Sequence, residues 1–253
     1  MFKDEFQAVC NGGVAKLNLM KNNPLGYFVS ALVAGMFISF GSFVAFVLGS
    51  VISAGDAASW TKLAQAFAFA SALSLVVMAG AELFTGNNLV LGAAAMRKKV
   101  TWGDACKLWL FCWVGNWIGS LLSVVVFKLT GIPTGDTGAY FGTIAQGKVG
   151  LAPVDLLTRA ILCNILVCLA VWCGTKLKTE SGKLIMIFWC ILVFMVCGFE
   201  HSIANMSIEG VALLNGDIAI GGYLYSVILA TIGNMIGGVV FVALPYHLIS
   251  REK

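Results

Sequence analysis

The stretch that decides the fold is Gly198-Phe199-Glu200-His201-Ser202-Ile203-Ala204-Asn205, which lies inside the long apolar run 184–214. Ionisable side chains are costly at the depth of a membrane, and there they usually mark a transport path or a binding site. The alternative is a structural Glu–His pair that neighbouring helices satisfy. The remainder of the chain favours the first interpretation.

The composition is that of a membrane protein. Of the 253 residues, 59% are hydrophobic and 11% are charged, and the mean hydropathy is +0.92. These values exclude an ordinary soluble domain. Each of six apolar segments reaches the roughly 20 residues that cross a bilayer as a helix. The segments are 26–50, 60–96, 103–130, 154–176, 184–214 and 222–248. We therefore expect a single all-α integral membrane domain over residues 1–253.

The N-terminal stretch 1–21 predicts an amphipathic helix on the membrane surface. Its apolar residues recur at helical spacing, as expected for a helix that lies in the bilayer interface. They are Phe2, Phe6, Val9, Gly13, Leu17 and Met20. The stretch is too polar for the core of a signal peptide. The eight cysteines form no CxxC pair, which indicates buried thiols, without a metal site or a disulfide framework.

The distribution of Lys and Arg predicts the orientation. With a cytoplasmic N-terminus, twelve of the sixteen cations, including Lys253, fall on the cytoplasmic side. The four that fall outside are Lys62, Lys128, Lys148 and Arg159. The positive-inside rule then places both termini in the cytoplasm. This bias accounts for the net charge of +4, so the charge indicates no nucleic-acid partner.

Two motifs repeat at a spacing of 118 residues. Glu82 and Asn87 in the second segment correspond to Glu200 and Asn205 in the fifth. In the third and sixth segments, Gly115-Asn116-Trp117-Ile118-Gly119 corresponds to Gly233-Asn234-Met235-Ile236-Gly237. Each half contains three spans, an odd number, so the second half enters the membrane from the opposite side. We expect an inverted repeat, with halves 22–131 and 140–253, of the kind found in channels and transporters.

The length of the second and fifth segments predicts a break in each. As straight helices, 60–96 and 184–214 would measure about 55 and 46 Å, whereas the hydrocarbon core is about 30 Å thick. A long tilted helix is the alternative. Irregular backbone at this depth is tolerated where it lines a cavity. We expect Asn116 and Asn234 to cap or bridge the broken backbone, and Glu82 and Glu200 to anchor the breaks through backbone N–H groups.

Three long motifs resemble the signatures of the formate/nitrite transporter family. They are Glu82-Leu83-Phe84-Thr85-Gly86, the run 162–172 from Leu162 to Trp172, and Phe199-Glu200-His201-Ser202-Ile203-Ala204-Asn205-Met206. The resemblance covers nearly the whole chain, including Asn23-Pro24-Leu25-Gly26. The glycine after Thr85 and the Asn-Asn-Pro-Leu-Gly run are most similar to the nitrite and hydrosulfide channels of that family.

The resemblance implies a homopentamer in a bacterial-type plasma membrane, with one pore in each aquaporin-like protomer. It implies passage of formate, nitrite or hydrosulfide, no enzymatic activity, no cofactor and no metal. Matched by position, the central pore residues are His201, its hydroxyl partner Thr85, Asn164, Glu200 and Asn205. The outer constriction is formed by Phe69, Leu73 and Phe194, and the inner one by Leu83, Phe84 and Val167. Lys148 is a vestibule residue in a variable loop, and His247 matches no family position, so we interpret it as an interfacial side chain.

The energetics favour passage of the neutral acid. A bare charge in low dielectric faces an idealised cost on the order of 20 kcal/mol. Protonating a carboxylate-like anion at neutral pH costs only about 5 kcal/mol. Lys148 would concentrate the anion, and His201 could donate the proton or polarise an acid whose proton comes from water.

Other functions fit the sequence less well. A proton-coupled carrier of the same anions remains open. A water or neutral-solute channel would show paired Asn-Pro-Ala turns, which are absent. A haem or quinone protein needs paired ligands or a dedicated pocket, and a hydrolase needs a HExxH or Ser/His/Asp arrangement.

Overall fold

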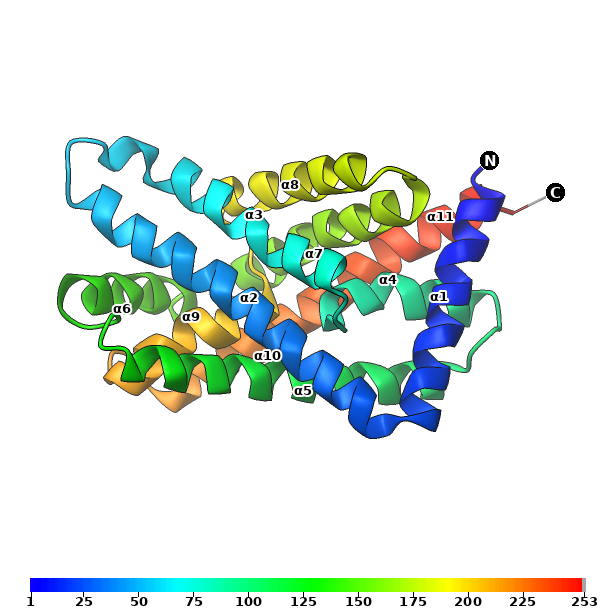
Figure 1. Ribbon diagram of the computed structural model, residues 1–253, viewed down its shortest axis with the longest axis horizontal. Helices are drawn as coiled ribbons and strands as arrows, with labels where there is room; N and C mark the ends of the chain where they lie inside the picture. The colour runs from blue at the N-terminus through cyan, green and yellow to red at the C-terminus, as the bar shows by residue number, and fades with distance from the viewer. Residues whose placement is uncertain (252–253) are drawn as a thin grey trace.

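The computed structural model describes residues 1–251, which form α-helices and no strand (Figure 1). Within this range six helical stretches are long and apolar enough to cross a membrane, as predicted. They are α2 (Pro24–Ser53), α3 (Thr61–Ala79, preceded by the 3₁₀ turn Ala58–Trp60), α5 (Trp102–Leu129), α7 (Pro153–Lys176), α8 (Glu180–Cys197), and α10 (Ile220–Gly238) continued by the π-helical turn Val239–Ala243 and α11 (Leu244–Ile249). Lys253, counted above among the cytoplasmic cations, lies outside the described residues.

Two of the shorter helices complete the broken segments. The second apolar segment is divided into α3 and α4 (Phe84–Met96), and the fifth into α8 and α9 (Ser202–Asn215). Helix α3 ends at Gly80, with φ 78°, and helix α8 ends at Gly198, with φ 71°. Glycine adopts this left-handed conformation without a steric cost, so it ends a helix abruptly. The predicted breaks in both segments are confirmed.

The paired glycines allow two helix crossings of matching geometry. Gly115 and Gly119 of α5 lie against Ala31 and Leu32 of α2, and Gly233 and Gly237 of α10 lie against Ala160 and Ile161 of α7. A Cβ atom at Gly119 or Gly237 would overlap the backbone carbonyl of the facing helix. Small residues at such crossings let two backbones approach closely. These contacts recur at the 118-residue spacing of the sequence motifs.

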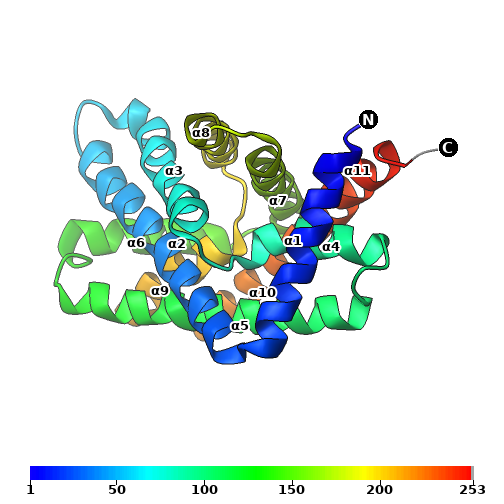
Figure 2. The same cartoon turned by 45° about the vertical axis from the view of Figure 1, so that its right-hand side comes forward.

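Helix α1 (Lys3–Asn22) is present as predicted, but protein covers its apolar face. Phe6, Val9, Gly13 and Leu17 are buried, and Gly13 approaches the carbonyl of Val90 on α4. Figure 2 shows α1 crossing over α4. Protein covers this apolar face because the close glycine contact lets the helix dock on α4, and a position of α1 at the membrane surface stays a prediction.

The two ends of the molecule carry different helices. Helices α1 and α11 lie at one end, and α6 (Gly135–Val149) lies at the other, beside the α2–α3 connection (Figure 1). His247 on α11 is buried, with its ring centroid 5.8 Å from that of Phe6. Its interpretation as an interfacial side chain is corrected, because α1 covers it.

Candidate functional site

The two breaks bring His201 and Thr85 together in the interior. His201 is the N-cap residue of α9, and Thr85 lies in the first turn of α4. The imidazole Nε2 lies 3.1 Å from Thr85 Oγ1, and both residues are buried. The sequence predicted this pairing. The imidazole also stacks on Phe194, with ring centroids 6.0 Å apart and an interplanar angle of 17°.

The hydrogen bonds of His201 determine its tautomer. Its Nδ1 accepts a hydrogen bond of 3.1 Å from the backbone N–H of Ala204, as an N-cap side chain does. A ring nitrogen that accepts carries no proton, so in the neutral ring the proton is on Nε2. Nε2 then donates to Thr85 Oγ1. Protonation of Nδ1 would remove the cap of α9.

Two asparagines bind the broken backbone, as predicted. Asn116 Oδ1 accepts from the N–H of Phe84 at 2.9 Å, and its Nδ2 donates to the carbonyls of Ala31 (2.6 Å) and Glu82 (2.9 Å). Asn234 makes the matching set of bonds in the other half. Its Oδ1 accepts from the N–H of Ser202 (2.9 Å), and its Nδ2 donates to the carbonyls of Ala160 (2.8 Å) and Glu200 (3.0 Å).

The carboxylates of the two breaks bind side chains, which corrects the expectation that they anchor backbone N–H groups. Glu200 Oε2 accepts from Lys148 Nζ at 2.6 Å and from Asn205 Nδ2 at 2.8 Å. Glu82 pairs with Lys16 Nζ at 2.5 Å and accepts from Asn87 Nδ2 at 3.0 Å. At the helix starts, Asn116 accepts from the N–H of Phe84 and Asn234 accepts from the N–H of Ser202. Each break therefore carries a Lys–Glu–Asn triad.

An outer cavity of about 290 Å³ opens on one side of His201. Three of the four cations predicted to face outward line it, namely Lys62, Lys148 and Arg159. Lys148 lies on helix α6, not in the expected loop. Glu200, Asn205 and Phe194 also line this cavity. With three cations and one carboxylate, its walls favour an anion.

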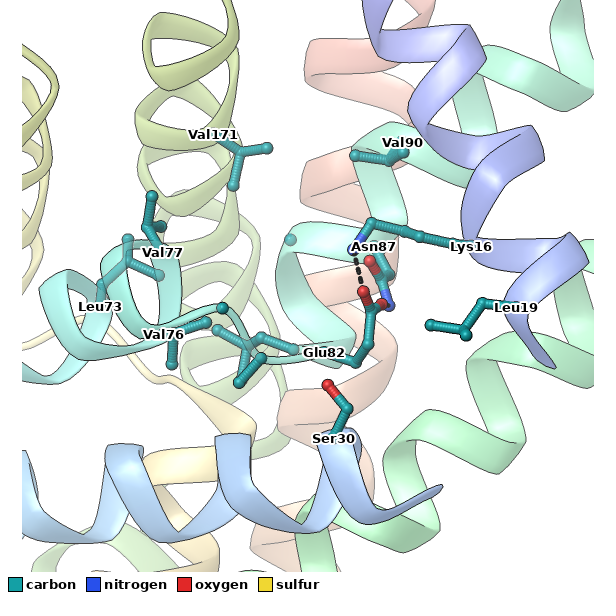
Figure 3. Close-up of a pocket in the computed structure, with 14 residues that line it drawn as sticks. Lys16, Leu19, Ser30, Leu73, Val76, Val77, Glu82, Asn87, Val90 and Val171 are labelled. Atoms are coloured by element: carbon teal, nitrogen blue, oxygen red, sulfur yellow. Dashed lines mark hydrogen bonds and ion pairs between the residues drawn. The ribbon is translucent and has the colours of Figure 1, made fainter. Parts of the chain in front are cut away.

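An inner cavity of about 440 Å³ lies on the other side of the breaks. Figure 3 shows Lys16 reaching from α1 toward Glu82, with Leu73 and Val171 on the other side of the cavity. Lys16 was not predicted as a site residue. It lies 132 residues before Lys148, so the 118-residue repeat does not reveal it. A search for one lysine to pair with the glutamate of each broken segment could have found Lys16.

The residues expected to form the two constrictions are not grouped in the structure as the resemblance implied. Phe69 and Phe194 meet edge to face, with ring centroids 5.8 Å apart. Leu73, expected beside them, lines the inner cavity together with Leu83. Val167 is buried, and Val171, one turn further along α7, lines the inner cavity.

Phe84 does not join Leu83 at the inner cavity. It borders an apolar pocket with Trp109, Trp113 and Met235, between α5 and α10. Leu83 has extended backbone, with φ −102° and ψ 125°, and successive side chains of an extended backbone point to opposite sides. The two side chains therefore border different pockets, and of the two only Leu83 lines the inner cavity.

Asn164 binds the backbone carbonyl of Thr85. Its Nδ2 lies 3.2 Å from the carbonyl oxygen of Thr85, 2.9 Å from Asn88 Oδ1 and 2.6 Å from the carbonyl oxygen of Asn234. Asn164 is completely buried. It therefore binds the backbone of Thr85, the residue whose hydroxyl contacts His201.

The chain is similar to known membrane transporters over its whole length. A family model described as "Formate/nitrite transporter" matches residues 3–248. The nitrite transporter NirC of Escherichia coli is 32% identical, with 97% of this chain and 91% of NirC covered. A solved "FNT family ion channel" superimposes with a TM-score of 0.92 at 29% identity and covers 98% of this chain and 99% of the other. A pentameric formate channel with formate bound gives a TM-score of 0.76 at 28% identity and covers 90% of this chain and 98% of the other.

Proposed function

This chain belongs to the formate/nitrite transporter family, and we propose that it passes formate, nitrite or hydrosulfide across the membrane as the transiently protonated acid. One observation carries the proposal. His201, in contact with the buried Thr85, lines the outer cavity, and the neighbours of Thr85 in the chain, Leu83 and Gly86, line the inner one. Each cavity holds a lysine paired with the glutamate of a broken helix.

The cations of the cavities attract the anion. The outer cavity is lined by Lys62 and Arg159 in addition to the Lys148–Glu200 pair. Clefts lined by one sign of charge raise the local concentration of the opposite ion. On the inner side Lys16, whose side chain is 25% exposed, has the same role. An anion can displace part of the Lys–Glu pairing because the lysine has three N–H donors.

Between the cavities, the path favours a neutral species. Phe194, Leu73 and Leu83 provide apolar walls on the two sides of the breaks. Protonation of the anion costs about 5 kcal/mol at neutral pH, far below the order of 20 kcal/mol for a bare charge in low dielectric. The Nε2–H of His201 and the Thr85 hydroxyl supply hydrogen bonds at the crossing point. The cap on Nδ1 supports a proton that comes from water, with His201 polarising the acid.

The assembly and the orientation complete the proposal. We propose a homopentamer with a pore in each protomer, because the 28% identical formate channel is pentameric. Both termini face the cytoplasm by the distribution of Lys and Arg. The membrane is the plasma membrane of a bacterial-type cell.

The test is anion flux into proteoliposomes from about pH 5 to pH 8. Formate, nitrite and hydrosulfide are compared for the wild type, His201→Asn, His201→Ala and Thr85→Ala. We expect flux to rise as the pH falls, both His201 variants to lose this dependence, and Thr85→Ala to weaken it. Superimposed curves from folded proteins would make His201 structural and refute the mechanism. Accumulation against a gradient, driven by an imposed proton gradient, would identify a proton-coupled carrier.

A further inference from the structure

Glu209 is a second buried carboxyl, outside the crossing point. It lies on α9 and is completely buried. The position 118 residues earlier is Leu91, so the first half has no counterpart. The proposed path of the anion does not involve Glu209.

A chain of hydrogen bonds connects Glu209 to the outer cavity. Lys148 Nζ lies 3.1 Å from Asn205 Oδ1, and Asn205 Nδ2 lies 3.3 Å from Ser226 Oγ. Ser226 Oγ lies 2.6 Å from Glu209 Oε1. An ammonium group only donates, so Asn205 Oδ1 accepts and its Nδ2 must donate. The Ser226 oxygen accepts from Asn205, which leaves the hydroxyl hydrogen for Glu209. The chain therefore ends on a carboxyl oxygen that accepts.

The other carboxyl oxygen, Oε2, is buried and has no hydrogen-bond partner. The next residue of α9, Gly210, packs against Leu121 and Val124 of α5. Burying an ionised carboxylate with a single donor is far more costly than burying the neutral acid. A proton on Oε2 would remove the charge without disturbing the bond at Oε1.

Few titratable groups act on Glu209. They are Lys148 of α6, Glu200 ahead of α9, and Tyr223 of α10. The Tyr223 hydroxyl is engaged by Trp117 Nε1 (2.8 Å) and the carbonyl of Met206 (3.3 Å). Helices α2 and α4, which also pack on α9, contain no charged residue. The charged residues of α5 lie at its two ends.

We propose that Glu209 is a proton-holding residue whose neutral carboxyl positions Ser226 and Asn205, and through them the Lys148–Glu200 pair of the outer cavity. The last link, anion capture by that pair, rests on the proposed function. The inner triad provides an internal comparison, because Asn87 is bound to the Tyr27 hydroxyl (3.1 Å) and lies 3.5 Å from Cys112 Sγ, without a second carboxyl.

Infrared spectroscopy tests the proton without any transport. The wild type is compared with Glu209→Gln, which keeps the shape and the accepting oxygen but cannot ionise. We expect the wild type at neutral pH to show the carbonyl stretch of a protonated carboxylic acid, and Glu209→Gln to lack this band. Spectra without such a band, or a band that persists in the variant, would overturn the assignment of the proton. This result stands whether or not the protein transports anions.

Sided flux tests the positioning role. In proteoliposomes of known orientation, we expect Glu209→Leu to raise the KM about 2- to 10-fold for anions that enter from the Lys148 side, the equivalent of one hydrogen bond. KM from the Lys16 side and the maximal rate should stay at wild-type values, and Glu209→Gln should restore KM. Equal KM in all three proteins would overturn the positioning role. Failure of Glu209→Gln to restore KM would show that the charge is required and overturn the neutral carboxyl.

A second variant covers a possible folding defect in Glu209→Leu. Ser226→Ala removes the middle of the chain and leaves the carboxyl in place, so it should raise the same one-sided KM. An unchanged KM in Ser226→Ala would also overturn the positioning role. Absence of anion flux in the wild type itself would refute the proposed function and leave the infrared result intact.

Discussion

At the residue scale, His201 combines a structural and a chemical role on its two ring nitrogens. Nδ1 caps α9 and Nε2 faces Thr85. These roles can be separated by substitution, because asparagine is among the best N-cap residues whereas alanine has no acceptor. A variant that keeps the cap and loses the imidazole therefore isolates the chemistry.

We expect His201→Ala to be less stable than His201→Asn by about 0.5–2 kcal/mol, the cost of a lost N-cap. Thermal unfolding of the detergent-purified proteins, followed by circular dichroism, measures the difference. Thr85→Ala is the control, because it removes the partner of Nε2 and leaves the cap intact. Equal stability of the two His201 variants would show that the Ala204 N–H does not depend on this acceptor.

Leu83 and Phe84 offer a matched pair of neighbours with different surroundings. Leu83 lines the inner cavity, whereas Phe84 borders the pocket between α5 and α10. We expect Leu83→Ala to widen the path and admit larger or charged species. Phe84→Ala should instead lower the stability by about 3–5 kcal/mol, as for other buried aromatic residues, with size selectivity unchanged. Flux of a series of carboxylates of increasing size, together with thermal unfolding, checks both outcomes. The same selectivity in Leu83→Ala and the wild type would contradict its place in the path.

At the scale of the element, the broken helices depend on two buried asparagines. Asn116 and Asn234 each make three hydrogen bonds that join a helix start to two carbonyl groups. No other side chain could replace an acceptor and two donors in this geometry without leaving a buried backbone group unpaired. The breaks are therefore positioned by α5 and α10, which are continuous helices.

We expect Asn116→Ala and Asn234→Ala each to lower the stability by roughly 3 kcal/mol, about 1 kcal/mol for each of three hydrogen bonds. Thermal unfolding and the yield of folded protein measure the loss. Asn18→Ala is the matched control, because Asn18 is exposed on α1. Wild-type stability in either buried variant would mean that water or neighbouring groups satisfy the broken backbone.

At the scale of the whole molecule, we predict the orientation in the membrane from the distribution of charge. Lys98 and Asp56 are exposed, in the α4–α5 and α2–α3 connections respectively. We expect a cysteine at position 98 to react with an impermeant maleimide only from the cytoplasmic side, and a cysteine at position 56 only from outside, by the positive-inside rule. The exposed native thiols Cys106 and Cys197 are replaced by serine beforehand. Labelling of position 98 from outside would contradict the predicted topology.

The assembly is tested by its mass. We expect native mass spectrometry in mild detergent to give five chains of 26.8 kDa, because oligomer symmetry is usually shared among relatives of similar fold, and one solved relative is pentameric. A stable trimer or tetramer would contradict the homopentamer. Monomers in harsh detergent and pentamers in mild detergent would still agree with it.

Much of the architecture could be predicted because it depends on local chemistry. Apolar runs long enough to span a bilayer, and the excess length of two of them, predicted six spans with two breaks. The polar residues within the breaks, and their repetition at 118 residues, indicated His201, Thr85, Asn116 and Asn234 as neighbours of the interrupted backbone. A polar group at membrane depth needs a partner, so polar residues within an apolar segment indicate where partners must lie.

The sequence by itself determined the class, the spans and the breaks, because these follow from the cost of exposing charge and backbone to lipid. Only the tertiary structure decided which side chains share a cavity. It showed that Lys16 belongs to the inner triad, that Phe84 and Leu83 border different pockets, that protein covers the apolar face of α1, and that Glu209 is connected to the outer cavity. These relations depend on the direction of each side chain after helices distant in sequence have packed, and the spacing of residues along one chain does not contain that direction.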